Sequence, residues 1–317
     1  MTAATRTAPR PGPFGRFRRD IRREETRWAF LFLLPWIFGF VVFTAGPMIA
    51  SGFLSFTDIG LRPTFKVVGL DNYERLIGDP RVGLALWNTT FYTLLHVPLS
   101  IALALALAIM LLRVGRAAGF FRTVFYLPTI TPTVAIGALW LQLLNGQVGL
   151  VNRGLALIGI NGPNWTTDPD WIKPGIVIMS LWALGSTVVI LFAALRNVPL
   201  ELYEAARVDG ANAWQQFRRV TLPMISGALF FVVIVNTIAS LQTFDQVYAM
   251  YFGNQPATAG DRQGLFYVVY LFNEAFKTFR MGYASALAWL LFFVIMIITF
   301  IQIRLSKRWV YYEGEGG

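Results

Sequence analysis

Long apolar stretches alternate with shorter polar segments along this chain of 317 residues. Six intervals run for twenty or more residues without Asp, Glu, Lys or Arg. They cover residues 28–57, 82–112, 123–152, 174–195, 220–244 and 281–303. Each interval can hold the roughly 20 apolar residues that a helix needs to cross a bilayer. The pattern therefore predicts an all-α integral membrane protein with six transmembrane helices.

Several residues inside these intervals are unusual for a plain membrane helix. Prolines interrupt the first and third intervals, and lipid tolerates them only where neighbouring groups satisfy the freed carbonyls. Leu and Ala alternate over residues 102–108, which predicts a small-residue face for close helix packing. His96 is the only histidine; a hydrogen-bonded packing role is favoured, and a role in proton transfer is the alternative.

The composition supports a membrane protein and restricts its chemistry. A mean hydropathy of +0.55 and a charged fraction of 14% are outside the range of an ordinary soluble domain. The chain contains no cysteine, so disulfides, zinc–thiolate sites and thiol chemistry are excluded. Residues 1–27 are rich in Arg and lack the features of a cleavable signal peptide. They are predicted to be a cytoplasmic tail with an interfacial helix, or else a merely solvated charged tail.

The formal net charge of +10 is distributed unevenly between two sets of polar segments. The N-terminus, residues 113–122 and 196–223, and the C-terminus together carry eighteen Lys or Arg against eight acidic residues. The other loops carry nine of each. The positive-inside rule predicts that the first set is cytoplasmic. We expect a cytoplasmic tail over 1–27, a membrane domain over 28–305 and a cytoplasmic tail over 306–317, with no nucleic-acid partner.

The polar segment 196–223 also has a helical pattern. Pro199 can begin a helix, because its missing N–H would be unpaired there in any case. Gly210 follows where a left-handed residue would end that helix. A second short helix is predicted over residues 211–219, with Trp214 and Phe217 on one side. The next apolar interval then begins with a proline, Pro223.

This segment resembles the EAA loop of binding-protein-dependent ABC importer permeases. The matching positions are Glu204, Ala205, Ala206, Gly210, Val220, Leu222 and Pro223. The run Asp209-Gly210-Ala211 is typical of the sugar-importer branch. Val220 stands where isoleucine is commoner, and Ser226–Gly227 stand where a further proline is frequent. A looser resemblance to the same branch covers residues 68–73 and 87–89.

The resemblance implies the type I ABC importer permease fold and a place in a multi-pass bacterial-type plasma membrane. Such a chain pairs with a second homologous permease, so that each supplies half of the translocation pathway. Two ATPase subunits dock below it, and an extracellular solute-binding protein delivers a carbohydrate, here a di- or oligosaccharide. Residues 196–223 would be the coupling loop that meets the ATPase. The chain itself would bind no cofactor, because ATP and Mg²⁺ would be held by the ATPase.

Two other classes of protein fit the residues less well. A stand-alone secondary carrier for a neutral solute typically couples ions through buried ionisable groups, whereas the six intervals hold no charged residue. A membrane-embedded enzyme would need paired carboxylates or zinc-spaced histidines, and the sequence has neither. It also lacks a P-loop of the form Gly-x4-Gly-Lys-Ser/Thr, so ATP binding by this chain is not expected. The chain is therefore expected to be a non-catalytic subunit.

Two polar clusters at membrane depth are candidates for the solute pathway. A neutral sugar needs apolar ring faces together with amide and hydroxyl groups in a concave site. The candidates are Ser180, Trp182, Thr187, Gln242, Thr243, Asp245 and Gln246. The resemblance places Trp182, Gln242, Thr243 and Gln246 near sugar-contacting positions of maltose-importer permeases. Neither cluster is basic, which argues against a strongly anionic substrate there; simple helix packing is the alternative.

Overall fold

The computed structural model describes residues 24–61, 66–252 and 260–310, and their regular elements are helices. Within these ranges, the strand-like pairing is a single antiparallel bridge between Thr57 and Val67. The expected cytoplasmic tail over 1–27 lies outside the described residues except for its last four positions. Residues 311–317 of the expected C-terminal tail also lie outside them, so both tail assignments remain predictions.

The helices follow one another with short connections. The first part of the chain contains α2 (Glu24–Phe40), η1 (Val41–Ala45), α3 (Gly46–Leu54), α4 (Asp71–Gly78), α5 (Pro80–Arg113), η2 (Gly115–Ala117), α6 (Ala118–Tyr126), η3 (Leu127–Ile130), α7 (Thr133–Leu143), α8 (Leu150–Leu157), α9 (Ile172–Leu181) and α10 (Gly185–Arg196). The second part contains α11 (Leu200–Val208), α12 (Ala213–Gln216), η4 (Phe217–Thr221), α13 (Leu222–Met224), α14 (Ser226–Leu241), α15 (Asp245–Tyr251), α16 (Gly260–Gln263), α17 (Tyr267–Phe272), η5 (Asn273–Lys277) and α18 (Met281–Ser306).

Four of the six predicted spans are single candidate membrane helices. They cover Arg27–Leu54, Pro80–Arg113, Ser226–Tyr251 and Met281–Ser306. The third and fourth predicted spans are each a bent pair of helices, with bends of 98° after Ile130 and 51° after Leu181. The structure thus supports an all-helical protein with four to six spans, and the count of six depends on each bent pair crossing as one.

The sharper bend has a local cause in the sequence. Thr131 precedes Pro132 and has an extended backbone, with φ −74° and ψ 134°. A proline ring clashes with a preceding residue in the helical conformation. The helix therefore stops at Ile130 and restarts at Thr133 in a new direction. The discontinuity expected from the prolines of the third interval is thus confirmed.

The longest helix, α5, is the central support of the bundle. The Asp79 carboxylate accepts a hydrogen bond of 2.9 Å from the backbone N–H of Arg81, which caps the helix, and Pro80 follows at its start. Its 34 residues correspond to about 50 Å at 1.5 Å per residue. The helix packs against α9, α10, α14 and α17. Ala104 and Ala108 are fully buried in this contact, so the predicted small-residue face is confirmed.

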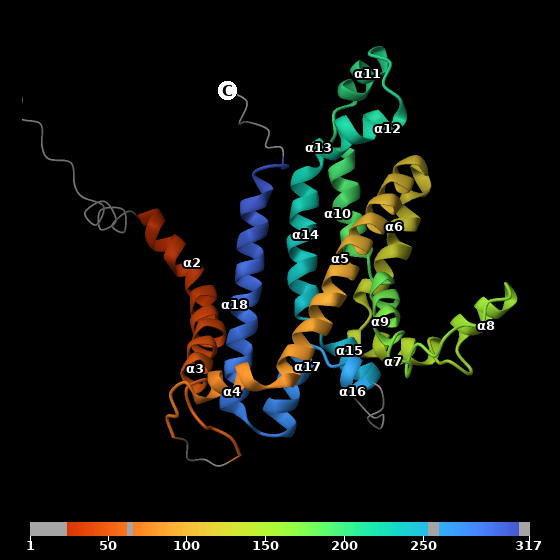
Figure 1. Cartoon of the computed structure of the whole chain (residues 1–317). Helices are drawn as coiled ribbons and strands as arrows, with labels where there is room; N and C mark the ends of the chain where they lie inside the picture. The colour runs from red at the N-terminus through yellow and green to blue at the C-terminus, as the bar shows by residue number, and fades with distance from the viewer. Residues whose placement is uncertain (1–23, 62–65, 253–259, 311–317) are drawn as a thin grey trace, which may run out of the picture.

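The bundle has two distinct ends (Figure 1). The start of α2 and the end of α18 lie at the end that carries α11 and α12, which we call the α11 end. The short helices α4, α15, α16 and α17 lie at the opposite end, which we call the α4 end, and α8 projects sideways there. One buried apolar cluster lies towards each end; the first includes Tyr92, and the second includes Ala104.

The helix formed by α2, η1 and α3 stands at the edge of the bundle beside α18. Its large apolar side chains are exposed: Phe32 is 80%, Trp36 67% and Phe43 74% accessible. A helix that is apolar on all sides is stable only when lipid or another protein surrounds it. This edge is therefore a membrane-facing or subunit-facing surface.

Candidate functional site

The first candidate site is the loop over residues 196–223, at the α11 end. Its first helix, α11, ends in a left-handed turn at Gly210, whose φ is +76°. The N–H of Ala211 donates to the carbonyl of Ala206 at 2.9 Å, and that of Gly210 donates to Arg207 at 3.0 Å. This pair of bonds is a Schellman motif, which glycine suits because it lacks a Cβ. The predicted end of the helix is confirmed.

The second part of the loop is fixed by its own side chains. Asn212 and Gln215 form a reciprocal capping box, with bonds of 2.8 and 2.9 Å. Trp214 and Phe217 lie on one side with ring centroids 5.6 Å apart, as predicted. The hydroxyl groups of Tyr203 and Thr221 lie 2.9 Å apart, which ties α11 to the π-helical turn η4. The loop is therefore an ordered unit.

The predicted coupling residues occupy the surface of this unit. Glu204, Ala205, Asp209 and Gly210 are exposed, whereas Ala206 and Ala211 are half-buried. Leu222 and Pro223 are half-buried in α13, where the chain enters α14.

The same surface exposes large apolar side chains. Val208 is 88%, Trp214 66% and Leu200 62% accessible. The loop lies outside the candidate membrane spans. Exposed apolar groups of this kind are typical of surfaces that contact a protein or a membrane.

The second candidate site is a cavity of about 300 Å³ at membrane depth, which we call the membrane cavity. It lies between α5, the break from α9 to α10, and the break from α14 to α15. Six of the seven predicted pathway residues line it: Ser180, Thr187, Gln242, Thr243, Asp245 and Gln246. Two clusters that are about 60 residues apart in the sequence are thus brought together.

The seventh predicted residue, Trp182, is not among the residues that line the membrane cavity. Its ring packs edge-on against Trp140, with centroids 6.2 Å apart, and 40% of its surface is exposed. It lies in the short break between α9 and α10. Helix packing, which the sequence analysis gave as the alternative to a pathway role, therefore describes the contacts of Trp182.

Hydrogen bonds hold the polar walls of the membrane cavity in place. The Tyr92 hydroxyl donates to Ser180 Oγ at 2.9 Å. Asn236 donates to Thr187 Oγ1 at 3.3 Å, which joins α14 to α10. Thr133 Oγ1 donates to the Asp245 carboxylate at 2.9 Å, which joins α7 to α15. Each wall is therefore fixed to a neighbouring helix.

Sequence reasoning did not place five polar lining residues in the pathway: Tyr92, His96, Ser186, Asn236 and Ser240. His96 Nδ1 lies 3.0 Å from Ser240 Oγ, and its ring stacks on Tyr92 at 5.1 Å. The predicted hydrogen-bonded packing role of His96 therefore describes its contacts, although the residue also faces the cavity. Tyr92 and His96 are one helical turn apart, and this spacing is the sequence signal that would have placed both rings on the same face of α5.

The α15 wall of the cavity depends on a close helix crossing. A Cβ built on Gly137 of α7 would lie 2.6 Å from the carbonyl oxygen of Gln246 and 3.0 Å from the Ala249 side chain. Only glycine fits so close to another backbone. This contact sets the position of α15, and with it the positions of Asp245 and Gln246.

The lining determines which solutes the membrane cavity can take. It offers amide and hydroxyl groups with the rings of Tyr92, His96 and Phe244 and a single carboxylate, and its described lining contains no Lys or Arg. Such groups suit the hydroxyls of a neutral polar solute. In the described part of the chain, no cluster of three or more His, Cys, Asp or Glu could hold a metal ion.

Comparisons with known proteins agree with this geometry. Residues 76–311 match the family model described as the binding-protein-dependent transport system inner membrane component. A probable ABC transporter permease protein of Bacillus subtilis, YesP, is 37% identical and aligns over 94% of this chain and 96% of its own length. The arabinooligosaccharides transport system permease protein AraP of the same organism is 31% identical over 94% of this chain and 93% of its own.

A solved structure has the same fold. It is a bacterial alginate ABC transporter in complex with an alginate pentasaccharide-bound periplasmic protein. One of its chains superposes with a TM-score of 0.79 at 25% identity, over 92% of this chain and 98% of that one.

Proposed function

This chain belongs to the family of binding-protein-dependent transport system inner membrane components, and we propose that it helps to import a carbohydrate. It is a permease subunit of a carbohydrate ABC importer. The relatives support this conclusion because one is a transport permease for arabinooligosaccharides and one belongs to an alginate transporter. The chain aligns with both over more than nine tenths of its length. A stand-alone secondary carrier is not favoured.

The observation that carries the proposal is the pair of ordered sites at different depths. The membrane cavity offers neutral polar groups to a solute. The loop over 196–223 offers apolar groups to a protein. A carrier that works alone needs only the first, whereas an importer driven by separate ATPases needs both. We assign the loop as the contact with the ATPase and the membrane cavity as this subunit's part of the pathway.

The coupling role follows from the chemistry of the loop. Ala205 and Ala206 allow close approach of a partner, and Glu204 presents an exposed carboxylate. The turn at Gly210 holds α11 and α12 in one fixed arrangement. Movement of an ATPase against this unit would pass to α14 through η4 and α13, which follow it directly in the chain. The chain supplies no ATP site; ATP and Mg²⁺ belong to the partner.

The same proposal sets the topology and the partners. Each bent pair of helices crosses the membrane as one broken span, which gives six spans, and the α11 end is cytoplasmic. Both termini then lie in the cytoplasm, because α2 begins and α18 ends at that end (Figure 1). A second homologous permease covers the exposed edge, two ATPases dock on the loop, and an external solute-binding protein docks at the α4 end.

The energy source distinguishes the importer from a carrier. The chain is reconstituted in proteoliposomes with its sister permease, ATPase and binding protein, and uptake of a labelled mixture of neutral and acidic oligosaccharides is measured. We expect uptake that requires ATP inside and binding protein outside, with no response to an imposed proton or sodium gradient. Uptake driven by an ion gradient without ATP would contradict the proposal.

Topology has a direct test, because the native chain has no cysteine. Single cysteines at Asn72, at Thr167 and at Asn212 report on α4, on the loop before α9 and on the start of α12. In intact cells an impermeant thiol reagent should label the first two and not the third. Permeabilised cells, in which all three should react, are the control. External labelling at position 212 would contradict the orientation.

A further inference from the structure

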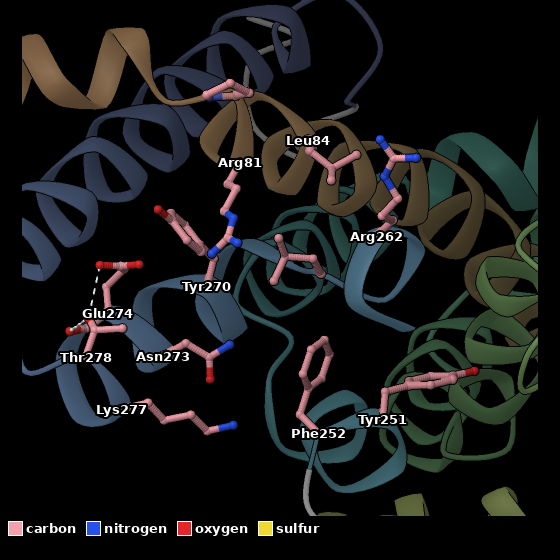
Figure 2. Close-up of a pocket in the computed structure, with 12 residues that line it drawn as sticks. Arg81, Leu84, Tyr251, Phe252, Arg262, Tyr270, Asn273, Glu274, Lys277 and Thr278 are labelled. Carbon is pink, nitrogen blue, oxygen red and sulfur yellow. Dashed lines mark hydrogen bonds between the residues drawn. The ribbon is translucent and has the colours of Figure 1, made fainter. Parts of the chain in front are cut away.

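A second cavity, of about 600 Å³, opens at the α4 end (Figure 2). It is built by the start of α5, the end of α15, and the segments α16, α17 and η5. We call it the outer cavity. Its volume is in the range of small-molecule sites, about 300–1,000 Å³. Among the described residues, none lines both this cavity and the membrane cavity.

The outer cavity is basic, unlike the membrane cavity. Figure 2 shows Arg81 and Lys277 extending from opposite sides towards the same space. In the described part of the chain, neither has a carboxylate within salt-bridge distance. The one described acidic lining residue is Glu274, which is only 3% exposed and is paired with Arg280 at 3.4 Å. Arg262 also lines the cavity, so its described lining holds three cations and one carboxylate, and that carboxylate is already paired with Arg280.

The other walls offer sugar-binding chemistry. The rings of Tyr251, Phe252 and Tyr270 line the outer cavity and supply flat apolar faces. Asn273 also lines it, and its Oδ1 is buried with no hydrogen-bond partner in the described structure. That oxygen is covered by protein, so the Nδ2 group of the side chain is the part that can donate to an oxygen of a bound sugar.

The walls are held rigidly by contacts outside the cavity. The Asp79 carboxylate accepts hydrogen bonds from the hydroxyls of Tyr270 and, at 2.8 Å, Tyr283, and it caps Arg81 at 2.9 Å. Burial opposes ionisation of Asp79, but these hydrogen bonds outweigh it and hold its pKa below the usual value. On the other side, the Asn88 amide donates to the carbonyls of Arg262 and Leu265, at 2.7 and 3.1 Å. The site is thus preformed.

The outer cavity is linked to the membrane cavity by one short helix. Asp245 and Gln246 at the start of α15 line the membrane cavity, and Tyr251 at its end lines the outer cavity. Seven residues of helix span about 10 Å, a length that a short oligosaccharide can reach across. The Lys277 ammonium lies 5.2 Å from the Tyr248 ring of the same helix. A ligand at Lys277 is therefore next to the helix that carries Asp245.

We propose that the outer cavity binds the carboxylate-bearing residue of an acidic oligosaccharide on its way to the membrane cavity. The inference rests on the proposed function and adds the substrate class. Arg81 and Lys277 hold the carboxylate, the aromatic rings stack on the sugar, and the Asn273 amide donates to a sugar oxygen. A concave site with aromatic walls suits a sugar ring better than it suits a protein surface. The uncharged residues of the oligosaccharide are the part that matches the membrane cavity, whose described lining contains no Lys or Arg.

The test measures direct binding to the assembled permease–ATPase complex in lipid nanodiscs, without binding protein. The probes are digalacturonate and its neutral counterpart digalactose, followed by saturation-transfer NMR and titration. Arg81→Gln and Lys277→Gln should each weaken digalacturonate binding about tenfold, because a hydrogen bond to a charged group is lost. Arg153→Gln, an exposed cation on α8 that lines neither cavity, should change it less than about twofold.

Digalactose should bind the wild-type complex at least about tenfold more weakly than digalacturonate, and thermal unfolding of the variants should match the wild type. Equal binding of the two sugars, or undiminished digalacturonate binding in both pocket variants, would overturn the inference. The inference would also be overturned if digalacturonate did not bind the wild-type complex and the two variants associated more weakly with purified binding protein. That result would show that the two cations contact the binding protein. Carbohydrate uptake driven by ATP reports separately on the proposed function, and it can stand when the inference fails.

Discussion

The loop over 196–223 and the membrane cavity are built by different kinds of contact. The loop is contiguous in sequence, and its shape comes from bonds between residues at most eighteen positions apart, such as Ala211 to Ala206. The membrane cavity collects residues between Tyr92 and Gln246 from five helices, α5, α9, α10, α14 and α15. A loop of this kind can be built from local backbone preference alone, whereas the cavity exists only when the whole bundle is packed.

The two regions also display opposite chemistry to their surroundings. The loop presents exposed apolar groups, such as Val208, on a polar part of the chain. The cavity presents amides and hydroxyls inside an apolar bundle. Each departs from what its environment favours, and this departure is the basis of the proposal that the loop binds a protein and the cavity binds a polar solute. The variants below separate these two roles.

The largest expected effect is at the turn of the loop. Gly210→Val should reduce uptake to background, because a β-branched residue is strained at a φ of +76° by about 1–3 kcal/mol. Gly210→Asn is the matched control, since asparagine tolerates this conformation and should keep most uptake. Reconstituted uptake and detergent-resistant co-purification of the ATPase measure the result. Full uptake by the valine variant would remove the loop from coupling.

Charge reversal in the loop should have the next largest effect. Glu204→Lys reverses an exposed carboxylate, and a like-charge contact with a basic ATPase groove costs several kcal/mol. The complex should lose its ATPase while the membrane domain keeps its thermal unfolding temperature. Glu201→Lys, on the same helix and also exposed, is the control and should assemble. Loss of ATPase in both variants would indicate a general charge effect and not a specific contact.

A smaller effect is expected inside the membrane cavity. Gln242→Ala removes an amide from its lining and should lower uptake about three- to tenfold, with ATPase assembly unchanged. Trp182→Ala should leave uptake of the remaining folded complex nearly unchanged and lower thermal stability instead, because Trp182 packs on Trp140. The two variants together separate pathway from packing. The opposite outcome, in which only Trp182→Ala slows uptake per folded complex, would place Trp182 on the pathway.

The smallest effect is expected at a wall of the cavity. Tyr92→Phe keeps the ring, which stacks on His96, but removes the hydroxyl that donates to Ser180. One hydrogen bond of this kind contributes about 0.6–1.5 kcal/mol. The unfolding temperature should fall slightly and uptake should change less than about threefold. A tenfold loss of uptake at unchanged stability would show that the hydroxyl contacts the solute.

Much of the architecture was predictable because its causes are local. The spans follow from uncharged intervals, the bend near Pro132 follows from proline geometry, and Gly210 follows from the end of a helical pattern. The six lining residues among the pathway candidates were found because polar groups at membrane depth stand out against apolar neighbours. Trp182 was grouped with them for its apolar ring and by the resemblance. Its neighbours Ala183 and Leu184 line the cavity, whereas its own ring packs on Trp140.

The sequence by itself determined the class of protein, the apolar spans, the turn of the loop and the charge imbalance between the two sets of polar segments. Each of these depends on residue type and spacing within one stretch of chain. Only the tertiary structure decided which polar residues share the membrane cavity, that Tyr92 and His96 face it, and that Arg81 meets Lys277 in the outer cavity. Their partners lie up to about two hundred residues apart, and helix packing, through contacts such as Gly137 against Gln246, sets distances that no local pattern contains.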